Sequence, residues 1–141
     1  MMVMTSKEIF IPVKPTPASR PRVSRYGTYH TKGYADFRSA MNKFFLSLEG
    51  DFEPIDKVKF KVELEIICHI PKKPTNPYPR GDVDNYVKGY LDCITYAQLF
   101  WADDIQVTEL VASKRYQEKG EDYGARVRIT QLHSQGDPYG I

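Results

Sequence analysis

The chain contains 141 residues, of which 41% are apolar, 27% are charged and 13% are aromatic, and its formal net charge is +2. This length predicts one domain, because about 100–200 residues per domain is typical. The composition excludes a disordered chain. No apolar stretch approaches the roughly 20 residues of a transmembrane helix, and the first ten residues lack the apolar core of a secretory signal.

The two cysteines, Cys68 and Cys93, lie in apolar segments without a second cysteine at zinc-site spacing. They predict buried free thiols and no zinc site. A reducing, cytoplasmic location in the cell interior is therefore expected, with no membrane partner.

The apolar pattern predicts the elements in chain order. A strand at 8–13 is closed by prolines, and a basic loop follows at 14–33. The first helix is predicted at 34–48, where apolar residues recur at steps of three and four: Phe37, Met41, Phe44, Phe45 and Leu48. The clearest strand lies at 58–70, where apolar residues alternate with lysine and glutamate.

A stiff, proline-rich loop then leads to residue 81. The second helix is expected from 82 or 83 to 96, with an apolar stripe of Val83, Val87, Leu91 and Ile94. Strands follow at 105–112 and 126–132 and are predicted to form an antiparallel hairpin around a turn at 120–124. Residues 133–141 are expected to form a loose polar tail.

The order strand, helix, strand, helix, strand, strand predicts an α+β fold in two layers. We expect a mixed sheet of about four strands with the two helices packed on one face, and a single domain over residues 1–141. The charged side of the long strand indicates that the other face of the sheet is solvated.

Polar residues gather at the start of the second helix, where Asp82, Asp84 and Asn85 follow the rigid loop. Helix capping explains such residues equally well. Asp84, Lys88 and Asp92 then follow at steps of four and share one helix face. They predict either an exposed ladder of ion pairs or a lysine held beside a carboxylate cluster.

The pair Asp103-Asp104 precedes the strand at 105–112. If that strand begins beside the N-terminus of the second helix, one of these aspartates meets Asp82 and Asp84. Three clustered carboxylates repel one another unless a cation lies among them. Oxygen ligands without histidine or cysteine favour Mg²⁺, or Mn²⁺ as a substitute, and such a site suits phosphodiester hydrolysis.

Basic residues on the two proline-rich loops offer contacts to a phosphate backbone, although solvated surface charge is the alternative. They are Lys14, Arg20, Arg22, Arg25, Lys32, Lys72, Lys73 and Arg80. Tyr26, Tyr29 and Tyr78 can stack on unpaired bases or can serve as packing residues.

Two blocks, GDVDNYVKGYLDCIT at 81–95 and FWADDIQV at 100–107, resemble the RusA family of Holliday-junction resolvases. The family pattern is Asp-x-Asp-Asn, Lys, Asp-Ala-Leu-Thr and then Trp-x-Asp-Asp-x-x-Val. The Arg20-Pro21-Arg22 stretch and the chain length also fit. Gly81 stands where the family often has proline, a change expected to loosen the loop.

The resemblance implies a homodimeric, Mg²⁺-dependent endodeoxyribonuclease that resolves four-way DNA junctions in recombination and repair. It implies that Asp82, Asp84 and Asp104 bind the metal and that Lys88 is catalytic. Asp103 is the alternative third ligand, and Asn85 and Asp92 are supporting residues.

Two other functions compete with this hypothesis. One is a catalytically silent protein of the same fold that binds branched DNA. The other is a metal-dependent phosphohydrolase for a smaller substrate, which the lack of a glycine-rich phosphate loop disfavours.

Overall fold

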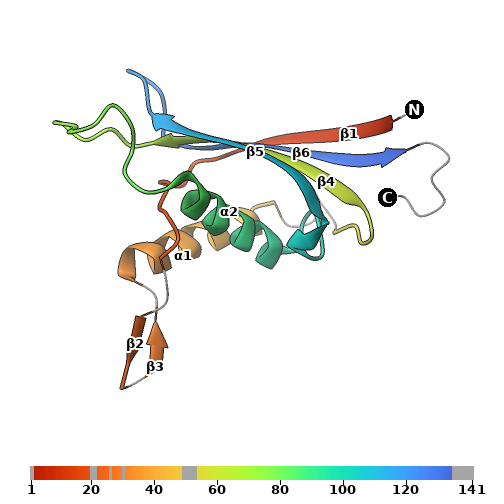
Figure 1. Ribbon diagram of the computed structural model, residues 1–141, viewed down its shortest axis with the longest axis horizontal. Coiled ribbons are helices and arrows are strands. Elements are labelled where there is room, and N and C mark those ends of the chain that lie inside the picture. Colours follow the sequence, from red (N-terminus) through yellow and green to blue (C-terminus); the bar gives the residue numbers. More distant parts are fainter. Residues whose placement is uncertain (1, 20–21, 26, 30, 49–53, 135–141) are drawn as a thin grey trace.

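The fold is a mixed, four-stranded sheet with two helices packed on one of its faces, as Figure 1 shows. The computed structural model describes residues 2–19, 22–25, 27–29, 31–48 and 54–134. The elements are β1 Met2–Ile11, β2 Arg22–Ser24, β3 Gly27–Tyr29, α1 Lys32–Leu46, β4 Lys59–Cys68, α2 Val83–Ala97, the 3₁₀-helix η1 Asp104–Gln106, β5 Val107–Tyr116 and β6 Gly124–Ser134. The predicted α+β class and element order are confirmed, with a short β2–β3 hairpin added.

Strand β4 lies inside the sheet, where it pairs with β6 along one edge and with β5 along the other. Phe60, Val62, Leu64 and Ile66 are buried against the helices, whereas the intervening lysines and glutamates are only partly buried. The alternation predicted from the sequence is thus confirmed. It fixes the register, since a slip by one residue would expose the whole apolar set.

The predicted hairpin between the last two strands is wrong. β5 pairs with β4 in parallel, and β6 pairs with the opposite edge of β4 and with β1, both antiparallel. Two parallel neighbours cannot be joined by a tight turn, so α2 serves as the crossover between β4 and β5. This connection places the C-terminal end of α2 next to the start of β5.

Several predicted boundaries are shifted at the edges of the sheet. β1 begins at Met2 instead of residue 8, and β5 continues to Tyr116, because an edge strand tolerates polar residues that face water. β6 extends through His133 and Ser134, the first two residues of the predicted tail. The remainder of that tail lies outside the described residues.

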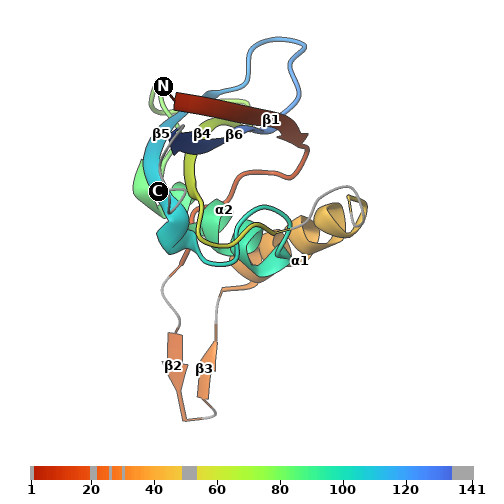
Figure 2. The ribbon, with the colours of Figure 1, turned by 90° about the vertical axis from the view of Figure 1, so that its right-hand side faces the viewer.

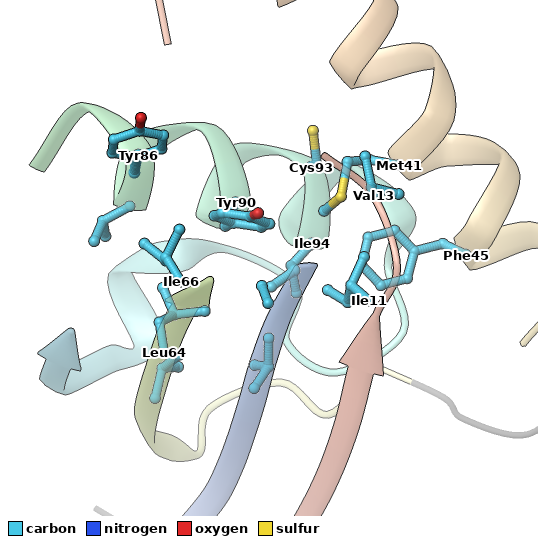
Figure 3. Packing of buried hydrophobic residues seen from close by; sticks show 14 of the residues in the cluster. Ile11, Val13, Met41, Phe45, Leu64, Ile66, Tyr86, Tyr90, Cys93 and Ile94 are labelled. Carbon is cyan, nitrogen blue, oxygen red and sulfur yellow. The ribbon is translucent and has the colours of Figure 1, made fainter. Parts of the chain in front are cut away.

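The core lies between the helices and the sheet, as seen close by in Figure 3. From α2 it receives Tyr86, Val87, Tyr90, Cys93 and Ile94, so the aromatic residues replace part of the predicted stripe. Val83 belonged to that prediction but is 39% exposed. Both cysteines are buried and free, as expected.

The outer face of the sheet is covered by ion pairs. Arg115 binds the Glu121 carboxylate through both terminal nitrogens, at 2.6 and 2.7 Å, and Arg128 lies 3.0 Å from Glu8. The Arg115 contact, together with a backbone hydrogen bond, lowers the pKa of Glu121 to about 2. The predicted solvated face is therefore confirmed, and its charges largely compensate one another.

Neither helix of the described chain has the length and apolar character that crossing a bilayer requires.

Candidate functional site

The N-terminus of α2 presents two carboxylates to solvent. Asp82 is the N-cap residue, and its backbone carbonyl accepts hydrogen bonds from the N–H groups of Asn85 and Tyr86 at 3.1 and 3.2 Å. The Asp82 side chain makes no capping hydrogen bond. The Asp84 carboxylate accepts the Asn85 N–H at 3.0 Å, and both aspartates are exposed. Capping therefore does not account for the side chain of Asp82.

The loop before α2 is held in place by three hydrogen bonds from side chains on β5 and α2. Lys114 on β5 donates to the carbonyl oxygens of Pro79 and Gly81 at 2.8 and 2.6 Å. The Tyr86 hydroxyl donates to the Arg80 carbonyl at 2.7 Å. Gly81 has a φ of +91°, which proline cannot adopt, so glycine fits this loop instead of loosening it.

A second group of charges lies further along α2. Lys88 and Asp92 form an exposed ion pair at 3.4 Å, as their four-residue spacing predicts. The pKa of the Asp104 carboxyl is raised by partial burial, by Asp103 and by the charge of Asp92, while Lys88 lowers it. Asp104 therefore faces the Lys88–Asp92 part of α2.

The conformation around Asp103 and Asp104 is set by the motif residues beside them. Trp101 is fully buried and donates its indole N–H to the Thr95 hydroxyl at 2.7 Å. The Asp103 carboxylate caps η1 by accepting the Ile105 N–H at 3.1 Å. Gln106 completes this capping box by accepting the Asp103 N–H at 3.1 Å. Asp103 thus has a structural partner at the start of η1.

The three aspartates proposed as metal ligands do not come together within the chain. Among the described residues, no group of three or more histidine, cysteine or acidic side chains is placed to hold a metal ion. The sequence hypothesis required β5 to begin beside the N-terminus of α2. Instead the end of β5, at Lys114, lies there, and Figure 1 shows the segment 98–106 at the opposite end of α2. Asp84 and Asp92 are eight residues apart, about 12 Å along the helix axis.

The basic residues surround the end of the molecule at which α2 begins. Lys72, Lys73 and Arg80 are exposed on the loop that leads into α2. The β2–β3 hairpin extends from the helix layer away from the sheet, and Figures 1 and 2 show it projecting from the body. Arg22 lies in β2, Arg25 is exposed at its turn, and Lys14 and Lys32 are exposed where the connecting segments reach the body. Arg20, Tyr26 and the remainder of the Arg-Pro-Arg stretch before β2 lie outside the described residues.

The segment before the hairpin is tied directly to the candidate site. The Ala18 N–H donates to the Asn85 carbonyl at 2.9 Å. Gly89 faces Phe37, Tyr34 and the backbone of Thr16 so closely that a Cβ atom would lie 3.3–3.7 Å from them. We call the β2–β3 hairpin, with the segment that precedes it, the basic arm. The base of this arm packs directly against the start of α2.

Two basic residues near the site were missed by the sequence analysis. Lys114 holds the loop before Asp82, and no local pattern signals this contact across 33 residues. Arg38 on α1 lies close enough to α2 to affect the Cys93 thiol. Burial raises the pKa of this thiol to about 11, the charge of Arg38 lowers it, and the charge of Asp92 raises it. Arg38 follows Tyr34 by four residues on α1, which was a detectable signal for a side chain near α2.

A model of the endodeoxyribonuclease RusA family matches residues 12–130. The chain belongs to this family. Among curated proteins, no sequence matches the chain significantly. The match includes the N-terminus of α2, the Trp101 turn and all of the basic residues named above. The RusA motifs thus combine exposed acidic residues with structural ones, such as the buried Trp101 and its partly buried partner Thr95.

Proposed function

We propose that this RusA family member is a structure-selective endodeoxyribonuclease that resolves four-way DNA junctions in recombination and repair. The observation that carries the proposal is the exposed pair Asp82 and Asp84, with the Asp82 carboxylate outside the helix cap and basic loops around it. The basic residues would neutralise phosphates that the acidic pair alone repels. A DNA substrate also supports a location in the cell interior.

We propose Mg²⁺, with Mn²⁺ as a substitute, as the cofactor. The residues of a single chain do not fit this ion, because Asp82 and Asp84 are separated from Asp104 along α2. The proposal therefore requires a homodimer in which Asp82 and Asp84 of one copy meet Asp104 of the other. A two-fold axis would create two such sites, as paired cleavage of a junction requires.

The remaining residues take roles that fit their surroundings. Asp104 suits the third ligand position better than Asp103, whose carboxylate already caps η1. Lys88 is exposed and offers an ammonium group for developing negative charge on the phosphate. Asp92 holds Lys88, and Asn85 joins the start of α2 to the basic arm through its carbonyl.

The test is a labelled synthetic four-way junction incubated with the protein, with and without Mg²⁺. The wild-type protein should cut the junction only with the metal and should cut a matched duplex far less. Asp84→Asn should abolish cutting while binding is retained or strengthened, because the change removes both a ligand and a repulsive charge. Asp122→Asn, at an exposed acid on the β5–β6 turn, is the matched control and should cut normally.

An intact junction after incubation with the wild-type protein in either metal would overturn the nuclease proposal. The dispersed carboxylates favour one alternative in that case, a catalytically silent protein that binds branched DNA. Tight junction binding without metal-stimulated cutting would support it.

A further inference from the structure

Tyr78 is an exposed aromatic residue held on a stiff loop. It is 55% exposed, although it lies in a segment with prolines at 74, 77 and 79, of which Pro79 is buried. Proline fixes φ and so reduces the conformations open to the loop. An aromatic ring that is both accessible and restrained loses little conformational entropy when it contacts a partner.

Lys114 restrains the Tyr78 ring from β5. Its ammonium lies over the ring, 5.8 Å from the centroid, within the range of a cation–π contact. The same ammonium donates to the carbonyls of Pro79 and Gly81, so it is fixed by the loop that it supports. The Tyr86 hydroxyl secures the next carbonyl, that of Arg80, from α2. The loop that carries the ring is thus fixed to both the sheet and the helix.

The surroundings of Tyr78 match a nucleic-acid strand better than an apolar partner. Lys72, Lys73 and Arg80 are exposed on the same loop, and Asp82 follows Tyr78 by four residues. Basic groups that contact phosphates, with an aromatic ring among them, are the elements of single-strand recognition. Paired bases inside a duplex are already stacked, whereas a base at the branch point of a junction can be unpaired.

We propose that Tyr78 stacks on an unpaired base at the branch point of the DNA, and that Lys114 is the residue that positions it. This inference rests on the proposed function and deepens it, because it assigns the preference for branched over plain duplex DNA to one side chain. Tyr78 lies outside the acidic group, so it affects recognition without taking part in hydrolysis.

The experiment compares binding to a four-way junction and to a matched duplex in the presence of a chelator, so that no cleavage occurs. Tyr78→Ala should weaken junction binding by about 5- to 150-fold, the range that loss of one stacked base gives, and should leave duplex binding within about twofold. Tyr78→Phe keeps the ring and should retain the preference. Phe10→Ala is the control, because Phe10 is an aromatic residue that is 36% exposed on edge strand β1, where it pairs with Arg126 on the outer face of the sheet.

The role of Lys114 is tested by the same ratio of junction to duplex affinity. Lys114→Met should lower this ratio, and adding it to Tyr78→Ala should lower it no further, because both changes remove one interaction. Lys114→Arg should restore the ratio, since guanidinium can also donate to both carbonyls. Trypsin should cut Lys114→Met faster after Arg80 than wild type, which reports the release of the loop independently of DNA.

An unchanged ratio in Tyr78→Ala would overturn the stacking inference. If the wild-type protein binds the junction and the duplex equally, junction selectivity in the proposed function fails instead. Single-stranded DNA then decides the inference: Tyr78→Ala must lose affinity for it, and equal affinity would rule stacking out.

Discussion

Tyr90 shows what a single buried group costs this fold. Its side chain is fully buried in the core, where Figure 3 places it between α2 and the sheet, and its hydroxyl has no hydrogen-bond partner among the described residues. Burial raises the pKa of this hydroxyl, so the group stays neutral. A buried donor without a partner costs about 1–3 kcal/mol.

We therefore predict that Tyr90→Phe raises the free energy of unfolding by about 1–3 kcal/mol, because it deletes the unpaired hydroxyl and keeps the ring. Urea unfolding measures this change. Tyr86→Phe is the control, since its hydroxyl is bonded to the Arg80 carbonyl, and it should lose about 1 kcal/mol. A loss of stability in Tyr90→Phe would mean that the hydroxyl has a partner in solution.

Local sequence patterns single out candidate side chains, but they do not show contacts that depend on the fold. Asp82 and Asp84 were recognisable because acidic residues beyond the need of a cap follow a rigid loop. Lys114 was not recognisable, because a lysine in a strand reads as a solvated side chain until the loop that it contacts is placed. A contact between residues 33 positions apart depends on the tertiary fold.

The elements differ in how strongly the sequence specifies them. β4 was recognisable because its buried apolar residues alternate regularly with charged ones. α2 was recognisable because its apolar residues recur at helical spacing over a typical helix length. The edge strands β1 and β5 were predicted too short, because their polar residues do not alternate with apolar ones in the pattern that indicates a half-buried strand. The β2–β3 hairpin was missed because only Gly27, with a φ of +121°, marks its turn.

The exposed lysines on the loop between β4 and α2 are expected to contact DNA phosphates. Lys72→Ala and Lys73→Ala should each weaken DNA binding similarly for all sequences and reduce the slope of log affinity against log salt by about 1. Titrations at several salt concentrations measure the slope. Lys43→Ala, at the exposed C-terminal turn of α1, is the control and should leave the slope unchanged. Unchanged slopes for all three variants would mean that the loop does not contact phosphates.

The topology of the sheet explains why the carboxylates lie at opposite ends of α2. A parallel β4–α2–β5 unit brings the end of β5 to the start of α2 and the start of β5 to its far end. The sequence hypothesis placed all three aspartates together on the condition that the strand at 105–112 begins beside the N-terminus of the second helix. Whether Asp104 lies near Asp82 and Asp84 depends on the strand topology, which residue spacing in the sequence does not reveal.

A mixing experiment tests whether two chains share each site. Asp84→Asn and Asp104→Asn should each be inactive as homodimers. In a heterodimer of the two, one shared site carries both substitutions and the other carries neither. Random mixing gives half heterodimers with one intact site of two, so junction nicking should recover to about a quarter of the wild-type level. Labelled junctions should show single nicks, because only one strand per complex can be cut.

The control mixture is Asp82→Asn with Asp84→Asn, which removes ligands from the same end of α2 in both copies. Every shared site in that mixture lacks one ligand, so nicking should not recover. If each chain instead formed a complete site by rearrangement on DNA, neither mixture would regain activity, because every chain would carry a substitution in its own site. Recovery in the first mixture alone is therefore the result expected of shared sites, and it follows directly from the separation of Asp104 from Asp82 and Asp84 along α2.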